Sequence, residues 1–383
     1  MTERPEALFT RLDLGRTRIA NRVAMAPMTR QRSALDGTPT ELNVEYYRQR
    51  AGAGLIVTEG IYPSDMGKGY LFTPGLHTPE HIAGWRQATD AVHMRGGTIF
   101  AQIMHVGRLS DPLMLDGRQP VAPSPVRPDP LARHYTVNCP RPKRPYPQPR
   151  ALSHPEVLGV IDEYRACALA ALDAGFDGVE IHAASGYLPM QFLSTNTNLR
   201  TDQWGGSVEK RGAFLLACVD AMTEVAGPGF VAVKLSPGWS FHNVFDDDPV
   251  ATYSHIVRQL SRRGIAYLQL GDYAVGWDVY GMLRPLFDGA VMVVAGFTRA
   301  SGAAMIATGR ADMVAYGQAY IANPDLAERY AAGQPLNRPD LATYYTQGEE
   351  GYTDYPVFAD VRDPASLQDV DAAPTPLDPE VTG

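Results

Sequence analysis

Polar side chains stand at the ends of several short apolar segments in the 383-residue sequence. In chain order they are Thr29 and Arg30, then Glu59 beside Gly60, then Gln102 and His105, then His182, and then Lys234. In a barrel of parallel strands, the carboxyl ends of all strands lie at the same end of the barrel. Polar residues that converge there commonly form the active site. A single His or Gln in such a place is more often a hydrogen-bonded packing residue, but five strand ends together favour a site.

Two glycine-containing turns late in the chain suit the binding of a phosphate group. Ala295-Gly296-Phe297-Thr298 and Tyr316-Gly317-Gln318 each place a Gly directly after an apolar segment. Glycine lets backbone N–H groups approach a phosphate closely, and the loops after strands seven and eight of a (β/α)8 barrel commonly hold one. Neither turn is specific alone, because such barrels use Gly in many strand-to-helix turns.

The elements that position these residues alternate in a regular way. Short apolar or β-branched segments are followed by amphipathic segments, which is typical of repeated β-α units. The expected strands span residues 22–27, 55–59, 98–104, 178–182, 231–235, 266–270, 290–295 and 313–316. Eight such strands predict a fold of the α/β class, a single (β/α)8 TIM barrel.

Four residues followed closely by Pro predict helix starts between the strands. They are Thr78, Ser153, Asp248 and Asn323, and Ser153 with Glu156 also fits a capping box. After Ser153 a helical stripe is expected to lie on the barrel; it comprises Val157, Val160, Ile161, Tyr164, Ala168, Ala171 and Leu172.

Two segments fall outside this rhythm. Residues 111–150 are rich in Pro, so they are expected to form a long excursion after the third strand that overhangs the carboxyl end of the barrel. Residues 361–383 are acidic and nearly free of aromatic residues, which predicts a loose, flexible tail after a barrel domain of residues 1–360.

Composition and charge exclude several function classes. A net charge of −8 argues against binding to nucleic acid or to anionic lipid, and no stretch approaches the roughly 20 apolar residues of a membrane span. Three widely spaced cysteines suggest neither a disulfide framework nor a metal site, so a cytoplasmic protein without a bound metal is expected. The sequence leaves open whether the chain is a monomer or a homo-oligomer.

The order of several motifs carries a resemblance over nearly the whole chain, from about Leu8 to Val357. The motifs are Arg22-Val23-Ala24-Met25-Ala26-Pro27-Met28-Thr29-Arg30, Ile181-His182-Ala183-Ala184-Ser185-Gly186-Tyr187-Leu188, Gln191-Phe192-Leu193, Asn198, Arg200, Asp202, Gly205-Gly206-Ser207, Ile321-Ala322-Asn323-Pro324-Asp325-Leu326 and Glu350-Gly351-Tyr352-Thr353-Asp354-Tyr355-Pro356. The chain resembles the old yellow enzyme family. The resemblance implies an FMN-dependent ene-reductase that passes hydride from NADH or NADPH through flavin to a small activated alkene, an α,β-unsaturated carbonyl or nitro compound.

The resemblance also implies how FMN is held. Pro27, Met28 and Thr29 would contact the flavin, and Gly60 with Gln102 would hold its pyrimidine edge. Lys234, where many relatives have Arg, would stabilise the anionic reduced flavin. A strand-end Lys could otherwise form a Schiff base, which does not explain the other strand ends. The phosphate would lie at Ala295, Gly296, Gly317 and Gln318.

The same resemblance assigns the substrate side. His182 would donate a hydrogen bond to the substrate oxygen, with Ser185 as a second donor, and Tyr187 would protonate the α-carbon. The alternative, that Tyr187 only packs, is weakened by its place five residues after His182. Tyr70 and Tyr352 would line or cap the substrate site.

Three positions depart from the family pattern. Ser185 stands in place of a second His or an Asn, Gln318 in place of the phosphate-binding Arg, and Met104 in place of a frequent Trp. These changes weaken the oxygen clamp, remove a charge and enlarge the pocket, respectively. They keep two alternatives open: a flavin- or ligand-binding barrel with weak catalysis, and a specialised biosynthetic oxidoreductase or isomerase with an unusual substrate.

Overall fold

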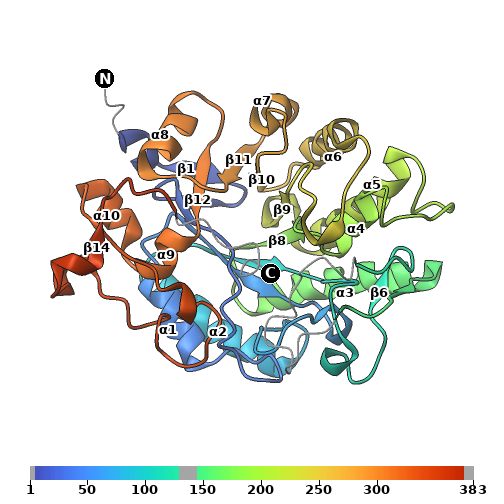
Figure 1. Ribbon diagram of the computed structural model, residues 1–383, viewed down its shortest axis with the longest axis horizontal. Coiled ribbons are helices and arrows are strands. Elements are labelled where there is room, and N and C mark those ends of the chain that lie inside the picture. The colour runs from blue at the N-terminus through green and yellow to red at the C-terminus, as the bar shows by residue number, and fades with distance from the viewer. Residues whose placement is uncertain (1–4, 129–144, 375–383) are drawn as a thin grey trace.

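Eight parallel strands close into a barrel in the computed structural model, which describes residues 5–128 and 145–374. In barrel order they are β3 (Val23–Met25), β4 (Leu55–Ile61), β5 (Ile99–Ile103), β8 (Gly178–Ala183), β9 (Val231–Leu235), β10 (Tyr267–Gly271), β11 (Ala290–Val294) and β12 (Met313–Tyr316). Figure 1 shows the helices arranged around these strands. The predicted TIM barrel is confirmed, and each predicted strand overlaps an observed one.

Helices follow the strands as the β-α rhythm predicts. They are α1 (Glu41–Gln49), α2 (Pro79–His93), α3 (His154–Asp173), α4 (Leu188–Leu193), α5 (Val208–Ala226), α6 (Pro249–Arg263), α7 (Val279–Leu283), α8 (Arg299–Ala307), α9 (Gln318–Ala322) and α10 (Leu326–Ala332). Thr78 and Asp248 cap their helices, and the capping box of Ser153 with Glu156 is present. The prediction at Asn323 is wrong, because Asn323 ends α9 and α10 begins after Asp325.

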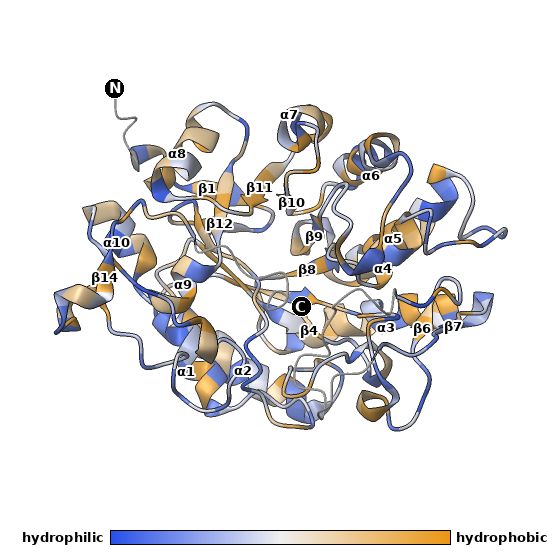
Figure 2. Ribbon diagram, viewed as in Figure 1, coloured by the Kyte–Doolittle hydropathy of each residue, from blue (hydrophilic) through white to orange (hydrophobic). Residues whose placement is uncertain are grey.

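Two apolar clusters form the core. One fills the barrel interior and includes Phe100, Tyr267 and Met292, together with Leu14 and Ile19 from the hairpin of β1 (Leu12–Leu14) and β2 (Thr17–Ile19), which the sequence did not predict. The other lies between barrel and helices. Figure 2 shows hydrophobic colour along many barrel strands and mixed colour along the surrounding helices. The predicted stripe on α3 is buried except for Leu172, which is 37% exposed.

The described parts of the excursion after β5, residues 111–128 and 145–150, contain only short elements, as their Pro content predicts. Pro112–Met114 form a single 3₁₀ turn, and β6 (Val121–Ala122) pairs in parallel with β7 (Arg150–Ala151) just before α3. The expected irregular segment around Cys139 lies outside the described residues.

The segment expected to be a loose tail is attached over its described part. β14 (Leu367–Gln368) pairs with β13 (Leu336–Asn337), and the Asp371 carboxylate accepts hydrogen bonds from the Ala300 backbone N–H at 2.8 Å and from Arg299 Nη2 at 3.2 Å. A carboxylate at the start of α8 satisfies an N–H group that the helix leaves unpaired. Residues 361–374 therefore belong to the folded body, and 375–383 lie outside the described residues.

Among residues 5–128 and 145–374, no helix has the length and apolar character that crossing a membrane requires. The same residues hold no group of three or more His, Cys, Asp or Glu side chains placed to bind a metal ion.

Candidate active site

A β-bulge in β4 determines which strand-end residues face the barrel interior. Val57 pairs with Phe100, but the register then shifts, and Gly60 pairs with Gln102. A bulge inserts an unpaired residue and so reverses the alternation of side chains along the strand. Gly60 and Gln102 lie together as predicted, whereas Glu59 points to α1, where the Tyr47 hydroxyl and the Asn43 amide face its carboxylate.

Glu59 belongs instead to a buried Arg–Tyr cluster, defined here as Arg30, Tyr46, Tyr47, Glu59 and Tyr352. The Arg30 backbone N–H donates to Glu59 Oε2 at 3.2 Å, and its Nη1 donates to the Tyr46 hydroxyl at 3.0 Å. Tyr352 is fully buried and stacks on Tyr46 at 4.1 Å between ring centroids. Tyr352 was predicted to line or cap the substrate site, and the structure corrects this: the residue is a packing element beside α1.

His105 also departs from the predicted convergence. The side chain is fully buried, and its Nδ1 accepts a hydrogen bond from the Gly107 backbone N–H at 3.1 Å. Burial lowers the pKa of His105 to about 4, so the ring is neutral at physiological pH. His105 therefore stabilises the turn after β5 through this hydrogen bond. All five predicted strand ends still supply a site candidate, namely Thr29, Gly60, Gln102, His182 and Lys234.

A polar layer crosses the barrel interior at the level of these strand ends. Gln102 Nε2 donates to Glu180 Oε1 at 2.7 Å, and His182 and Lys234 are neighbours in the β8–β9 register. Burial raises the pKa of Glu180 to about 7, opposed by nearby Lys234 and by the hydrogen bond from Gln102. Burial lowers the pKa of Lys234, which the charge of Glu180 opposes. The layer therefore couples an acid and a base inside the barrel.

His182 and Tyr187 lie together at the end of β8. Their ring centroids are 4.8 Å apart with an interplanar angle of 80°, and each side chain is 5% exposed. Burial, followed by the nearby titratable groups Lys234 and His242, holds the pKa of His182 well below its usual value, so the imidazole is neutral. Within the described residues, His182 Nδ1 is buried and has no hydrogen-bond partner.

The Tyr187 phenol keeps its proton at neutral pH. Burial raises the pKa of Tyr187, and its hydroxyl lies 3.0 Å from the hydroxyl of Tyr70. Ser185 lies on the turn between the two, half-buried, with a left-handed backbone at φ 53°. The turn thus brings together a neutral imidazole, a hydroxyl and a protonated phenol, which are the groups that the sequence predicts here.

Other residues packed around Tyr187 include two that the sequence reasoning missed. Tyr70, Met104 and Tyr187 share a buried cluster with Tyr146, and the Tyr345 phenol lies near enough to raise the pKa of both Tyr70 and Tyr187. Tyr345, and not Tyr352, which was expected to line or cap the substrate site, lies near Tyr187. Tyr146 lies in the Pro-rich excursion. Because the excursion was predicted to overhang the carboxyl end of the barrel, its aromatic residues could have been named as candidates for this cluster.

The predicted phosphate turns have the backbone that a phosphate-bearing cofactor requires. Ala295 and Gly296 adopt left-handed φ values of 101° and 76° directly after β11. An added Cβ on Gly296 would have no described heavy atom within 4 Å, and one on Gly317 would meet only Met28 Sδ, at 3.4 Å. Backbone N–H groups here are open to a close approach. Half-buried Gln318 follows Gly317.

The flavin side of the expected site is also consistent with FMN. Pro27, Met28 and Thr29 are half-buried after β3, and Met28 reaches Gly317 of the second phosphate turn. Neither nearby cation is free to replace the missing Arg at Gln318. Arg299 pairs with Asp371, and Arg310 pairs with Asp278.

Comparison with known proteins decides the family. The profile of the NADH:flavin oxidoreductase / NADH oxidase family matches residues 7–337. The chain belongs to this family. Its resemblance to old yellow enzymes is confirmed, and so is the predicted class, an NAD(P)H-dependent FMN oxidoreductase of the ene-reductase type.

Several relatives match over almost their whole length. A probable flavin mononucleotide-dependent alkene reductase of Leishmania infantum is 41% identical over 92% of this chain and 97% of its own. 12-Oxophytodienoate reductase 2 of Arabidopsis thaliana is 39% identical over 91% of this chain and 95% of its own. Among solved structures, morphinone reductase in complex with tetrahydroNAD superimposes with a TM-score of 0.87 at 41% identity, over 93% of this chain and 99% of that chain. The old yellow enzyme homologue of Zymomonas mobilis superimposes with a TM-score of 0.88 at 36% identity, over 92% of this chain and 99% of that chain.

The raised pKa of Glu180 predicts that the free energy of unfolding depends on pH, and that Glu180→Gln makes this dependence weaker. Between the unfolded value of 4.5 and the folded value of about 7, the folded state binds more protons, so stability falls as pH rises. The loss approaches about 1.4 kcal/mol per pH unit for this group. Urea unfolding at pH 5, 6 and 7 measures it. We expect a shallower pH slope in Glu180→Gln, whereas exposed Glu80→Gln keeps the parent slope; equal slopes in all three proteins would contradict the coupling.

Proposed function

We propose that the enzyme reduces the C=C bond of small α,β-unsaturated carbonyl or nitro compounds, with His182 as the hydrogen-bond donor to the substrate oxygen and Tyr187 as the proton donor. The observation that carries the proposal is the pairing of a neutral, buried imidazole with a protonated phenol at 4.8 Å between ring centroids. When bound, FMN supplies the hydride carrier between NAD(P)H and the alkene. Relatives named for alkene, 12-oxophytodienoate and morphinone reduction support this substrate class.

The two side chains then have separate roles. A neutral His182 donates one N–H to the substrate oxygen, where negative charge develops as hydride is added to the β-carbon. Tyr187 donates its proton to the α-carbon, and the neighbouring Tyr70 hydroxyl orients the phenol. Ser185 is the second, shorter donor to the same oxygen, and Met104 lines the substrate site.

We assign FMN binding to residues at or near the carboxyl ends of six different strands. Pro27, Met28 and Thr29 would contact the flavin, and Gly60 and Gln102 would hold its pyrimidine edge. Lys234 would stabilise the negative charge of the reduced ring. The backbone of Ala295, Gly296 and Gly317 with the Gln318 amide would hold the phosphate. The close approach of Met28 to Gly317 supports a single ligand that spans both groups. The barrel of residues 1–360 is the catalytic domain in this proposal.

The visible spectrum of the purified protein tests the proposal. Flavin bands that bleach under NADH or NADPH without oxygen, and return when an enone is added, are the expected result. Bands that bleach but do not return would favour a flavin-binding barrel with weak alkene reduction. Turnover of the enone without NAD(P)H consumption would favour the isomerase alternative. A colourless protein that FMN cannot reconstitute would overturn the FMN assignment.

Gln318→Arg is expected to slow FMN dissociation. A guanidinium adds a charge-assisted, two-pronged hydrogen bond to a phosphate, roughly twice as strong as a neutral one. Arg299 and Arg310 are already paired with carboxylates, so the added charge does not duplicate them. Recovery of flavin fluorescence on dilution measures release. Gln87→Arg, which adds the same charge at an exposed position on α2, is the control; equal release rates in both variants and the parent would contradict the assignment.

A further inference from the structure

Within the turn between His182 and Tyr187, the backbone of Ser185 is held by one neighbouring loop, residues 236–248 after β9. The Ser185 backbone N–H donates to Ser236 Oγ at 3.1 Å, and the Ser185 carbonyl lies 2.8 Å from His242 Nδ1. Side chains of one loop thus take both backbone polar groups of Ser185. A carbonyl oxygen only accepts hydrogen bonds, so His242 carries its proton on Nδ1.

His242 packs directly against this turn. Its side chain is fully buried, and an added Cβ on Gly186, where φ is 78°, would lie 2.9 Å from His242 Cβ and 3.0 Å from the Phe241 carbonyl oxygen. The imidazole lies 6.1 Å from the Tyr187 ring between centroids. A shift of His242 therefore displaces the backbone that precedes Tyr187, because the two segments are closely packed against each other.

The loop that carries His242 is itself fixed at two points. Arg108 Nη2 donates to the carbonyls of His242 and Asn243 at 2.9 and 2.6 Å. These two residues have left-handed φ values of 57° and 53°, a conformation that persists only where the surroundings enforce it.

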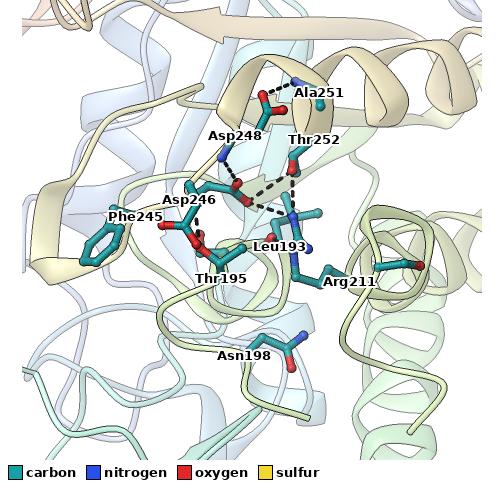
Figure 3. Close-up of polar contacts among 12 residues, drawn as sticks. Leu193, Thr195, Asn198, Arg211, Phe245, Asp246, Asp248, Ala251 and Thr252 are labelled. Carbon is teal, nitrogen blue, oxygen red and sulfur yellow. Dashed lines mark hydrogen bonds and ion pairs between the residues drawn. The ribbon is translucent and has the colours of Figure 1, made fainter. Parts of the chain in front are cut away.

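The second fixed point is the ion pair shown in Figure 3, in which Arg211 Nη2 lies 3.2 Å from Asp246 Oδ2. Both groups face the Thr252 hydroxyl: Arg211 Nη2 donates to it at 2.9 Å, and it donates to Asp246 Oδ2 at 3.1 Å. Two buried arginines, one from the loop after β5 and one from α5, therefore hold the His242 loop in place.

From these contacts we infer that His242 is a positioning residue for the proton-transfer step: its Nδ1–H holds the Ser185 carbonyl and so sets the place of the Tyr187 phenol relative to the substrate. The inference rests on the role proposed above for Tyr187. His242 makes no contact with the substrate oxygen in this proposal and is not a proton donor. Its contribution is geometric, and a displacement of about 1 Å in such a group can cost on the order of 10²-fold in rate.

The test compares two substitutions in the FMN-loaded enzyme. His242→Leu removes the donor, whereas in His242→Asn the amide Nδ2 can take the place of Nδ1. We expect the rate of alkene reduction to fall about 10- to 100-fold in His242→Leu and to recover to within about threefold of the parent in His242→Asn. Flavin reduction by NAD(P)H does not use Tyr187, and its rate stays near the parent value in both variants.

A double substitution separates positioning from packing. In a Tyr187→Phe background, His242→Leu should add no further loss of alkene reduction, since both changes act on one group. An equal additional loss would show that His242 acts elsewhere and would overturn the inference. If Tyr187→Phe alone left alkene reduction intact, the proposed proton donor itself would be wrong, and that outcome is distinct from a failure of His242.

Two further measurements do not depend on turnover. Nitrogen-15 NMR of the imidazole should find the proton of His242 on Nδ1, and hydrogen exchange at the Ser185–Tyr187 amides should accelerate in His242→Leu but not in His242→Asn. His81→Leu is the matched control: His81 is a buried histidine whose Nε2 bonds the Asp36 carbonyl at 3.0 Å, and its loss should leave both half-reactions unchanged. A His242 proton on Nε2 alone, or equal rates of alkene reduction in parent and His242→Leu, would overturn the inference.

Discussion

Tyr187→Phe is expected to lower the rate of alkene reduction by about 10²- to 10⁴-fold, the usual contribution of a general acid, while flavin reduction by NAD(P)H keeps its parent rate. The phenol can take this role because burial raises its pKa and so keeps it protonated at neutral pH, and because its hydroxyl lies 3.0 Å from that of Tyr70. Phenylalanine preserves the ring packing beside His182 and removes the hydroxyl that carries the proton. Rapid mixing that follows each half-reaction separately measures both rates.

Tyr70→Phe serves as the comparison for this experiment. It removes the hydrogen-bond partner of Tyr187 but leaves the proposed donor in place, so we expect a loss about tenfold or smaller, well below that of a missing general acid. If Tyr187→Phe reduced an enone at the parent rate, the proton would have to come from Tyr70, from Tyr345 or from water. Equal losses in both variants would instead indicate a pair of phenols that acts as one unit.

The barrel could be predicted from the sequence because each strand is a short apolar run between turn residues, and the count of eight restricts the fold. The face on which a strand-end residue lies could not be predicted. Glu59 ends a strand in the sequence, but the extra residue between Val57 and Gly60 turns it out of the barrel. A bulge depends on the pairing of two strands, and no local signal in β4 marks it.

Tyr352 and Tyr345 show the same limit in a loop. Both follow α10 in a stretch with no helical or strand periodicity, so the sequence offers no rule for which of them reaches the site. The choice is made by partners far away in the chain: Tyr46 stacks on Tyr352, and Asn43 donates to its hydroxyl at 3.2 Å. Family motifs located the segment correctly but not the side chain that points to Tyr187.

The attachment of the tail follows the same logic. Asp371 is one of several carboxylates in an acidic, aromatic-poor segment, and composition alone predicts disorder for it. Its place at the start of α8 depends on a strand pairing with Leu336–Asn337, more than 30 residues earlier in the chain. Non-local contacts of this kind leave no periodic trace, which explains why the turn that carries His182 and Tyr187 was predicted and its supports were not.

Arg30→Met is expected to lower the free energy of unfolding by about 3–5 kcal/mol, the range for removing one partner from a buried charged network. Arg30 is 1% exposed, and its guanidinium donates to the Tyr46 hydroxyl and to the carbonyls of Tyr344 and Gly351 at 3.0, 3.2 and 2.8 Å. Methionine approximates the volume of the stem but leaves these acceptors unpaired. Urea unfolding of the two proteins at one pH measures the difference.

Two further variants identify the cause of that loss. Arg258→Met removes an exposed arginine and should change stability by less than about 0.5 kcal/mol. Combining Arg30→Met with Glu59→Gln should restore part of the lost free energy of unfolding, because the neutral amide at position 59 does not require a cation nearby to compensate its burial. A cost below about 1 kcal/mol for Arg30→Met would contradict the network. Since Arg30 directly follows Pro27, Met28 and Thr29, the variant should also release FMN faster, which connects the stability of this cluster to the cofactor site it supports.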